Sequence, residues 1–145
     1  PEKREELTTE GGLDMLAAGS RIAAIIAQLK SADIAVSLFL DPSIPQIEAG
    51  IDTGADAIEL HTGTYANAAD NQKNEELYIL TRAAEHIHSA GVILNPGHGL
   101  YYVNVLPIAS IPEIHELNIG HTIIARAVFT CLSAAVREMK QLIAT

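Results

Sequence analysis

Two Gly-His pairs are the residues whose types and spacing best suit chemistry in this chain. His98 stands between Gly97 and Gly99 in the string NPGHG, and His121 follows Gly120 in the string ELNIGH. Each string lies at the end of an apolar run that is typical of a β-strand. Histidine moves protons near neutral pH, and glycine lets the backbone approach a ligand closely. We therefore interpret His98 as an acid–base group, in preference to a histidine that caps a turn.

Gly120 and His121 also precede a long helical pattern. The first N–H groups of a helix, together with the helix dipole, bind phosphate and other anions. The sequence therefore predicts a phosphate site at this pair, with a simple tight turn between strand and helix as the alternative. Because His98 and Gly99 end the preceding strand, a phosphorylated small molecule would lie beside a group that can move a proton.

Four further polar residues lie at the ends of expected strands, namely Glu59, His61, Glu116 and Asn118. We expect Glu59 to be functional, because an inward carboxylate needs a partner. The sequence has no HExxH, CxxC or EF-hand pattern and no Gly-x-Ser-x-Gly motif. We therefore expect neither a bound metal nor a serine nucleophile, although histidines at three strand ends leave a metal site as an open alternative.

The composition indicates a single domain over residues 1–145, with 48% hydrophobic and 19% charged residues. The net charge of -9 argues against a nucleic-acid partner, since such proteins present a positive surface to the phosphate backbone. Any phosphate must therefore be held by local groups. The longest apolar run is too short to span a bilayer and the charged start lacks the features of a signal peptide, so we expect no membrane partner.

Apolar spacing predicts helices that alternate with strands. The expected strands are 34–40, 57–61, 92–95 and 114–119, and the expected helices are 13–32, 42–52, 74–88, 104–110 and 121–142. Asp41 is expected to cap the second helix, with Pro42 at its first helical position. Cys131 falls on the apolar stripe of the last helix and is therefore expected in the core. As the only cysteine, it excludes an internal disulfide and favours a reducing compartment, the cytoplasm.

The order of elements, without hairpin signals, indicates parallel strands joined by helices. Polar residues alternate with apolar ones toward the strand ends, as in strands that have one face under helices and the other inside a (β/α)₈ TIM barrel. A full barrel needs eight strands and about 250 residues. Residues 1–145 would therefore supply four βα units, about the C-terminal half of a barrel.

Four strings of the chain are familiar: PEKREELTTEGGLD, IELHTGTYA, NPGHGLYYVNV and IPEIHELNIGHTIIARAVF. Together they resemble, collinearly and over essentially the whole chain, the pyridoxine 5'-phosphate synthase family of vitamin B6 biosynthesis. The resemblance is to the C-terminal part of that family, from the end of the fourth barrel strand through βα units 5 to 8. Pro96 departs from the family pattern, which usually has a small residue such as alanine there.

The resemblance implies a transferase that condenses 3-amino-2-oxopropyl phosphate with 1-deoxy-D-xylulose 5-phosphate. Pyridoxine 5'-phosphate, inorganic phosphate and water are the products, and no cofactor or metal takes part. The residues that match the family's site are His98 as proton donor, Gly99, Gly120 and His121 at the aminoketone phosphate, Thr8 at the deoxyxylulose phosphate, and Glu59 in the pocket lining. A homo-oligomer, commonly an octamer, is expected as well.

The resemblance also implies that two general bases, a histidine and a glutamate, lie on strands outside these 145 residues. A polypeptide of residues 1–145 alone is therefore expected to be inactive and prone to associate through open sheet edges. Without the resemblance, a phosphate-binding barrel isomerase or epimerase would fit the same residues, and a non-catalytic binding module is the third alternative.

Overall fold

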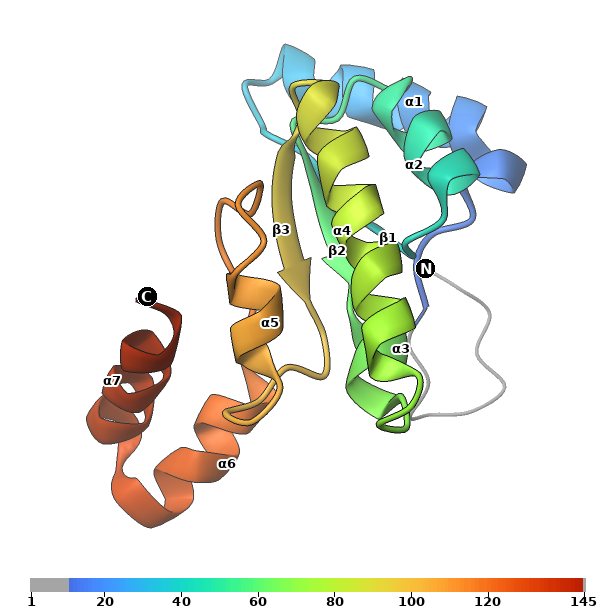
Figure 1. The fold of residues 1–145 in the computed structure, drawn as a ribbon. Helices are drawn as coiled ribbons and strands as arrows, with labels where there is room; N and C mark the ends of the chain where they lie inside the picture. The colour runs from blue at the N-terminus through green and yellow to red at the C-terminus, as the bar shows by residue number, and fades with distance from the viewer. Residues whose placement is uncertain (1–10, 145) are drawn as a thin grey trace.

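Three parallel β-strands form the sheet on which the candidate site is built. The structure, a computed structural model, describes residues 11–144. Its strands are β1 (Ser37–Leu40), β2 (Ala57–His61) and β3 (Ile93–Gly97), in that order across the sheet. Each strand runs parallel to its neighbour, so the carboxyl ends of all three meet at one edge (Figure 1). The predicted α/β class with parallel strands is confirmed, and β2 has the predicted bounds.

Among the described residues, one helix precedes β1, and further helices follow each strand, with three of them after β3 in the sequence. Within residues 11–144 they are α1 (Met15–Ser31), α2 (Ile44–Ile51), α3 (Gly63–Asn67), α4 (Lys73–Ser89), α5 (Val105–Ala109), α6 (His121–Thr130) and α7 (Leu132–Ile143). α2 packs on β1 and α4 on β3, while α7 contacts both α5 and α6 on the other side of β3 from β1 (Figure 1). None of these helices combines the length and the apolar character that crossing a membrane requires.

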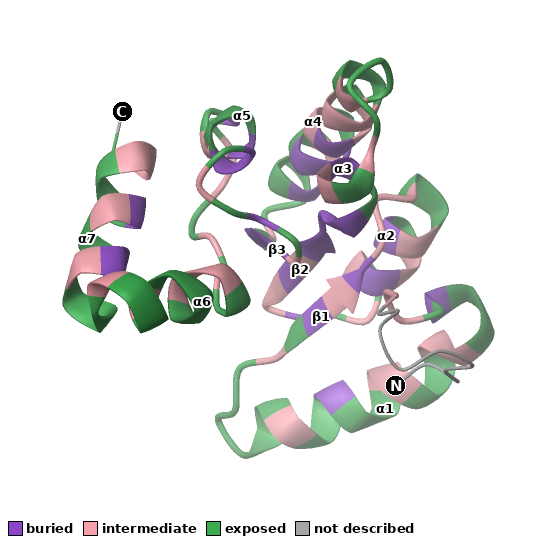
Figure 2. Cartoon of the chain, turned by 90° about the horizontal axis from the view of Figure 1, so that it is seen from below, coloured by how far each residue is buried: buried purple, intermediate pink, exposed green. Residues whose placement is uncertain are grey.

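The two faces of the sheet differ in the way that the sequence predicts. One face carries alternate residues that are at most 3% exposed, namely Leu38, Leu40, Ile58, Leu60 and Leu94. They belong to the hydrophobic core that the helices close, and Figure 2 shows the buried positions gathered in the strands and on the helix sides that face them. The other face carries Phe39, Glu59, His61 and Asn95. Hydrophobic burial therefore holds one face in place while the other presents polar groups.

The fourth predicted strand, 114–119, does not form a ladder. It lies parallel to β3 but joins it through one bridge, Gly97↔Asn118. The N–H of His115 donates to the carbonyl of Leu94 at 3.0 Å, and the N–H of Asn118 donates to that of Pro96 at 3.0 Å. The donors are spaced one residue further apart than the acceptors, so the segment carries an extra residue and bulges away from β3.

Pro96 lies inside β3, whereas the sequence predicts that the strand ends before it. The strand continues through Pro96, opposite Leu60, to Gly97, opposite His61. The nitrogen and oxygen of one strand residue point to the same side, and the Pro96 oxygen accepts from Asn118. The missing N–H of Pro96 therefore faces the segment 114–119 and leaves the pairing with β2 intact. The same missing donor interrupts the ladder to the fourth predicted strand.

Asp41 does not cap α2, so that prediction was wrong. Ser43 takes the N-cap position, and Pro45 lies in the first turn. The N–H of Ser43 donates to the carbonyl oxygen of Asp41 at 2.7 Å, which places a turn between β1 and the helix. The strand predicted over 34–40 is also shorter, because the Asp56 carboxylate accepts the Val36 N–H at 2.8 Å just before β1 begins.

The predicted last helix is interrupted and forms α6 and α7. Cys131 lies between them with φ 67° and ψ 157°, a conformation that no helix contains. The single apolar stripe is therefore divided. Met139 is buried on α7, whereas Val128 on α6 is 78% exposed. Cys131 itself is exposed, which corrects its predicted place in the core.

Replacing Cys131 with glycine should stabilise the intact protein. A residue with a Cβ in this region of φ and ψ costs about 1–3 kcal/mol, whereas glycine adopts it readily. We expect Cys131→Gly to raise the free energy of unfolding in urea by about 1 kcal/mol. Cys131→Ser keeps the Cβ and is the matched control, with an expected change below about 0.5 kcal/mol. Equal unfolding midpoints for the two variants would contradict the strain at this position.

Candidate active site

The carboxyl ends of β2 and β3 border a pocket of about 680 Å³. Its lining includes the predicted site residues Glu59, His98, Gly99, Gly120 and His121. They come from β2, from the turn after β3 and from the beginning of α6. The sixth predicted residue, Thr8, lies outside the described residues. The structure therefore brings these five residues together, and Asn118 with them, whereas His61 and Glu116 do not line the pocket.

His98 has a backbone conformation that is uncommon outside glycine. Its φ is 82°, and Gly99 follows with φ 75°. The hydroxyl of Thr62, buried at the end of β2, lies 2.8 Å from the carbonyl oxygen of Gly97 and 2.5 Å from that of His98, so its one proton is shared between them. The Thr62 N–H donates to the Gly97 oxygen as well, at 2.9 Å. Thr62 therefore holds the strained turn that presents His98.

Asn104 fixes the loop after His98, a role that the sequence analysis missed. Its side chain accepts the N–H of Tyr101 at 2.7 Å and donates to the carbonyl of Gly99 at 3.1 Å. The Tyr65 hydroxyl donates to the Asn104 carbonyl at 2.9 Å, and burial raises the pKa of Tyr65, so this donor keeps its proton. The signal that could have identified Asn104 is the tendency of asparagine to bond a nearby backbone group within a turn.

Glu59 has the partner that an inward carboxylate was expected to need. Its Oε2 accepts a hydrogen bond from the Asn118 side-chain amide at 2.7 Å. Asn118 is held in turn by its own backbone bond to Pro96 and its bridge to Gly97. The carboxylate therefore lies at the pocket with a defined orientation and with Oε1 on the side of Gly97.

His61 follows Glu59 on the same face of β2 but does not line the pocket. Its ring is buried, and Nδ1 lies 2.7 Å from Oδ1 of Asp41. The register of β1 against β2 explains this contact, because Leu40 pairs with Leu60 and the next residues of both strands are Asp41 and His61. The sequence placed His61 at a strand end without a role and assigned Asp41 to a helix cap, so the pair was not anticipated.

Gly120 leaves the beginning of α6 open to the pocket. A Cβ added at Gly120 would meet no atom within 4 Å, and no described side chain caps the helix there. The first N–H groups of a helix have no acceptor in the helix itself and carry the positive end of its dipole. The pocket lining drawn from residues 11–144 contains no lysine or arginine. The described residues thus offer an anion the N–H groups at the start of α6 and the two histidines of the lining.

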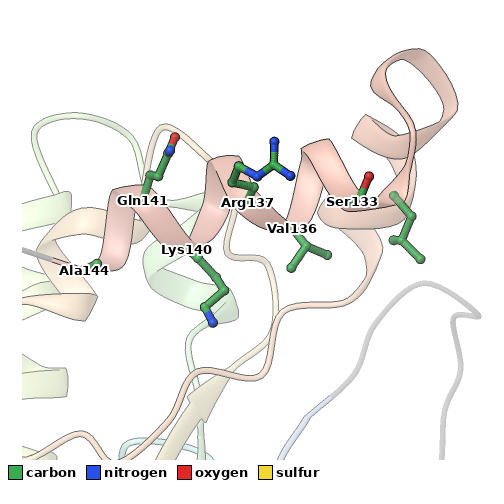
Figure 3. A pocket seen from close by; sticks show the side chains of 7 residues that line it. Ser133, Val136, Arg137, Lys140, Gln141 and Ala144 are labelled. Atoms are coloured by element: carbon green, nitrogen blue, oxygen red, sulfur yellow. The ribbon is translucent and has the colours of Figure 1, made fainter.

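A larger hollow, of about 870 Å³, lies along α7 and does not compete with this site. Figure 3 shows its side chains projecting from that one helix, and the lining residues are Leu132, Ser133, Val136, Arg137, Lys140, Gln141 and Ala144. None of them is a histidine or a carboxylate, so the hollow offers no acid–base group for neutral pH. Within residues 11–144, histidine, cysteine, aspartate and glutamate side chains do not gather in groups of three or more that could hold a metal.

Gly97 must be a glycine for Glu59 and Asn118 to meet. A Cβ at this position would lie 2.6 Å from Oε1 of Glu59 and 2.9 Å from Cβ of Asn118. We expect Gly97→Ala to lower the free energy of unfolding of the intact protein by about 1–3 kcal/mol, the usual range for overpacking. Gly120→Ala, which adds the same methyl group in open space, is the control for stability. Equal urea midpoints for the two variants would show that the segment 114–119 is not held against β3 in this way.

Comparison with known proteins identifies the family. The model of the pyridoxal phosphate biosynthesis protein PdxJ matches residues 1–145. The chain is 53% identical over 141 residues to pyridoxine 5'-phosphate synthase of Thioalkalivibrio sulfidiphilus, covering 97% of this chain and 57% of the relative. It is 51% identical over 144 residues to the protein of that name from Akkermansia muciniphila, covering 99% of this chain and 58% of the relative.

A third relative, pyridoxine 5'-phosphate synthase of Magnetococcus marinus, is 54% identical over 143 residues, which are 98% of this chain and 59% of the relative. The chain spans about 58% of the length of the curated relatives it matches. The resemblance that the sequence strings carry is therefore confirmed along the whole chain. Residues 1–145 belong to the PdxJ family of pyridoxal phosphate biosynthesis proteins.

Proposed function

We propose that the intact protein is a pyridoxine 5'-phosphate synthase that condenses 3-amino-2-oxopropyl phosphate with 1-deoxy-D-xylulose 5-phosphate. One observation carries the proposal: in a chain of the PdxJ family, residues from three separate segments, all predicted for this reaction, line one pocket. Because the chain spans about 58% of the length of its relatives, we propose this activity for the intact protein and not for residues 1–145 alone. Family membership favours this reaction over the isomerase or epimerase that the residues alone would also fit.

His98 is the proton donor in this proposal. Condensation of an amine with a ketone expels an oxygen atom as water, and that oxygen leaves only after it gains a proton. The imidazole of His98 lies at the pocket on a turn whose backbone is held by Thr62 and Asn104. A donor on such a support keeps its position relative to a bound substrate, which is the condition for efficient proton transfer.

Gly99, Gly120 and His121 hold a substrate phosphate in this proposal. The open start of α6 supplies N–H donors and the positive end of a helix dipole, and Gly99 allows the backbone to approach. Glu59, already oriented by Asn118, supplies a hydrogen-bond acceptor in the same lining. Thr8 as a contact to the deoxyxylulose phosphate and the absence of a cofactor or metal stay predictions of the family resemblance.

A (β/α)₈ barrel is the architecture we propose for the intact protein. Parallel strands with one apolar and one polar face support it, as does the parallel course of 114–119 beside β3. The chain would supply βα units 5 to 8, and the two general bases would lie on the other strands. The inactivity of residues 1–145 alone, the octamer and the cytoplasmic location stay predictions.

Replacing His98 with asparagine tests the proton donor. Asparagine keeps some hydrogen bonding but cannot relay a proton, so turnover by the intact protein should fall by about 10²–10⁴-fold. His88→Asn makes the same change at an exposed position in the last turn of α4 and should leave turnover unaltered. Unchanged turnover of His98→Asn with both substrates would remove His98 from the mechanism.

Replacing Gly120 with valine tests the phosphate site. The branched side chain would occupy the open space before α6 that an anion must enter. We expect titration calorimetry of the intact protein to show at least about tenfold weaker binding of pyridoxine 5'-phosphate, the cost of losing one or two good hydrogen bonds to the anion. Gly19→Val is the control, since Gly19 also has open space around it but lies on α1 away from the pocket. Unaltered affinity in Gly120→Val would place the phosphate elsewhere.

A further inference from the structure

We propose that Asp41 and His61 are a positioning pair that orients the imidazole of His98 and so sets its ability to donate a proton. The inference rests on the proposed function, because it concerns the step assigned to His98. Neither residue lines the pocket among the described residues. The role proposed for them follows from how the three side chains are packed.

The first support is the contact between Asp41 and His61. Nδ1 of His61 lies 2.7 Å from Oδ1 of Asp41, close enough for a strong hydrogen bond to a carboxylate. The Asp41 side chain is half exposed, whereas that of His61 is 9% exposed. A carboxylate beside Nδ1 assigns the proton to that nitrogen, so Nε2 becomes the acceptor in the neutral ring. Asp41 thereby determines both the tautomer and the plane of His61.

The second support is the packing of His61 against His98. The two ring centroids are 4.7 Å apart with an interplanar angle of 68°, an edge-to-face arrangement. Phe39 of β1 packs against both rings, at 5.0 Å from His61 and 6.4 Å from His98. The three rings form one cluster on the polar face of the sheet. A rotation of His61 would therefore displace His98.

The third support is the close approach of α3 to the same cluster. A Cβ at Gly63 would lie 2.5 Å from Nε2 of His61 and 3.2 Å from Cδ2 of His98, so only glycine allows the helix to cover both rings. The space that a rotated His61 ring would need is thus occupied by backbone. Asp41, Phe39, Gly63 and His98 therefore all lie against the His61 ring.

The remaining nitrogen of His61 distinguishes this cluster from ordinary core packing. Nε2 is buried and has no hydrogen-bond partner among residues 11–144. An unsatisfied buried acceptor costs free energy that an apolar ring at this position would not cost. Departures of this kind from local rules are expected at functional sites, and the ring of His98, a site residue, packs against His61. His61 therefore keeps a buried nitrogen without a partner among residues 11–144 in the ring that packs against His98.

A double-mutant cycle in the intact protein tests the pair. His61→Phe keeps the ring packing and removes both nitrogens, and Asp41→Asn keeps the size of the side chain and removes its charge. Each should lower kcat by about tenfold to 100-fold, which is within the range of measured couplings between residues in contact. The KM of both substrates should stay within about twofold of its value in the unmodified protein. In the His98→Asn background neither change should lower kcat further, because the group on which the pair acts is absent.

Matched controls separate this effect from general damage. His88→Phe and Asp52→Asn make the same chemical changes at exposed positions and should leave kcat unaltered. Asp41→Asn is the variant that stays informative if His61→Phe fails to fold, since Asp41 lies half in solvent. A raised KM in place of a lowered kcat would contradict a positioning role.

The outcomes also separate this proposal from the proposed function. If His98→Asn is strongly impaired and the losses from His61→Phe or Asp41→Asn simply add to it, His98 remains the proton donor and the positioning pair is refuted. If His98→Asn retains full turnover, the proton donor itself is refuted, and the pair with it. Both the proton donor and the positioning pair are supported only if the loss of kcat seen in His61→Phe and Asp41→Asn disappears in the His98→Asn background.

Discussion

The register of β2 against β3 is the constraint on which the rest of the site depends. Leu60 pairs with Pro96 and His61 with Gly97, so both strands finish at the same level. Thr62, the next residue of β2, then reaches the carbonyl groups of Gly97 and His98. A slip of one residue would turn every side chain of β2 to the other face and bury Glu59 and His61 against the helices. The apolar alternates on the core face prevent that slip, so hydrophobic burial sets the positions of the polar groups.

Beside the pocket, a strained backbone turn is held by hydrogen bonds from neighbouring side chains. His98 and Gly99 both have positive φ, and a histidine in that region costs free energy that the surroundings must offset. The Thr62 hydroxyl, the Asn104 side chain and the Tyr65 phenol supply those hydrogen bonds. Among residues 11–144 the lining lacks lysine and arginine, and the N–H groups at the start of α6 are donors that it offers to an anion.

Local patterns predicted those parts of the structure that burial and periodicity determine. The bounds of β2, the alternation of its faces and the gathering of Glu59, His98 and His121 followed from the sequence, because parallel strands end at one edge. Pairings between distant residues were not predictable in this way. Asp41 was assigned to the nearest helix, yet its partner is His61 on the next strand. The predictions for Pro96 and Cys131 were wrong for a similar reason. Which side of the strand the Pro96 nitrogen faces, and the positive φ of Cys131 between α6 and α7, both depend on tertiary contacts.

A crystal structure of the intact protein with bound pyridoxine 5'-phosphate tests the central claim, that strand register builds one site from His98 and the start of α6. We expect the phosphate to accept hydrogen bonds from the backbone N–H groups at Gly120 and His121. We also expect the His98 imidazole to lie within hydrogen-bonding reach of the bound product, about 2.6–3.2 Å between heavy atoms or through one water. A product bound away from the ends of β2 and β3, or a His98 ring turned from it, would contradict the account.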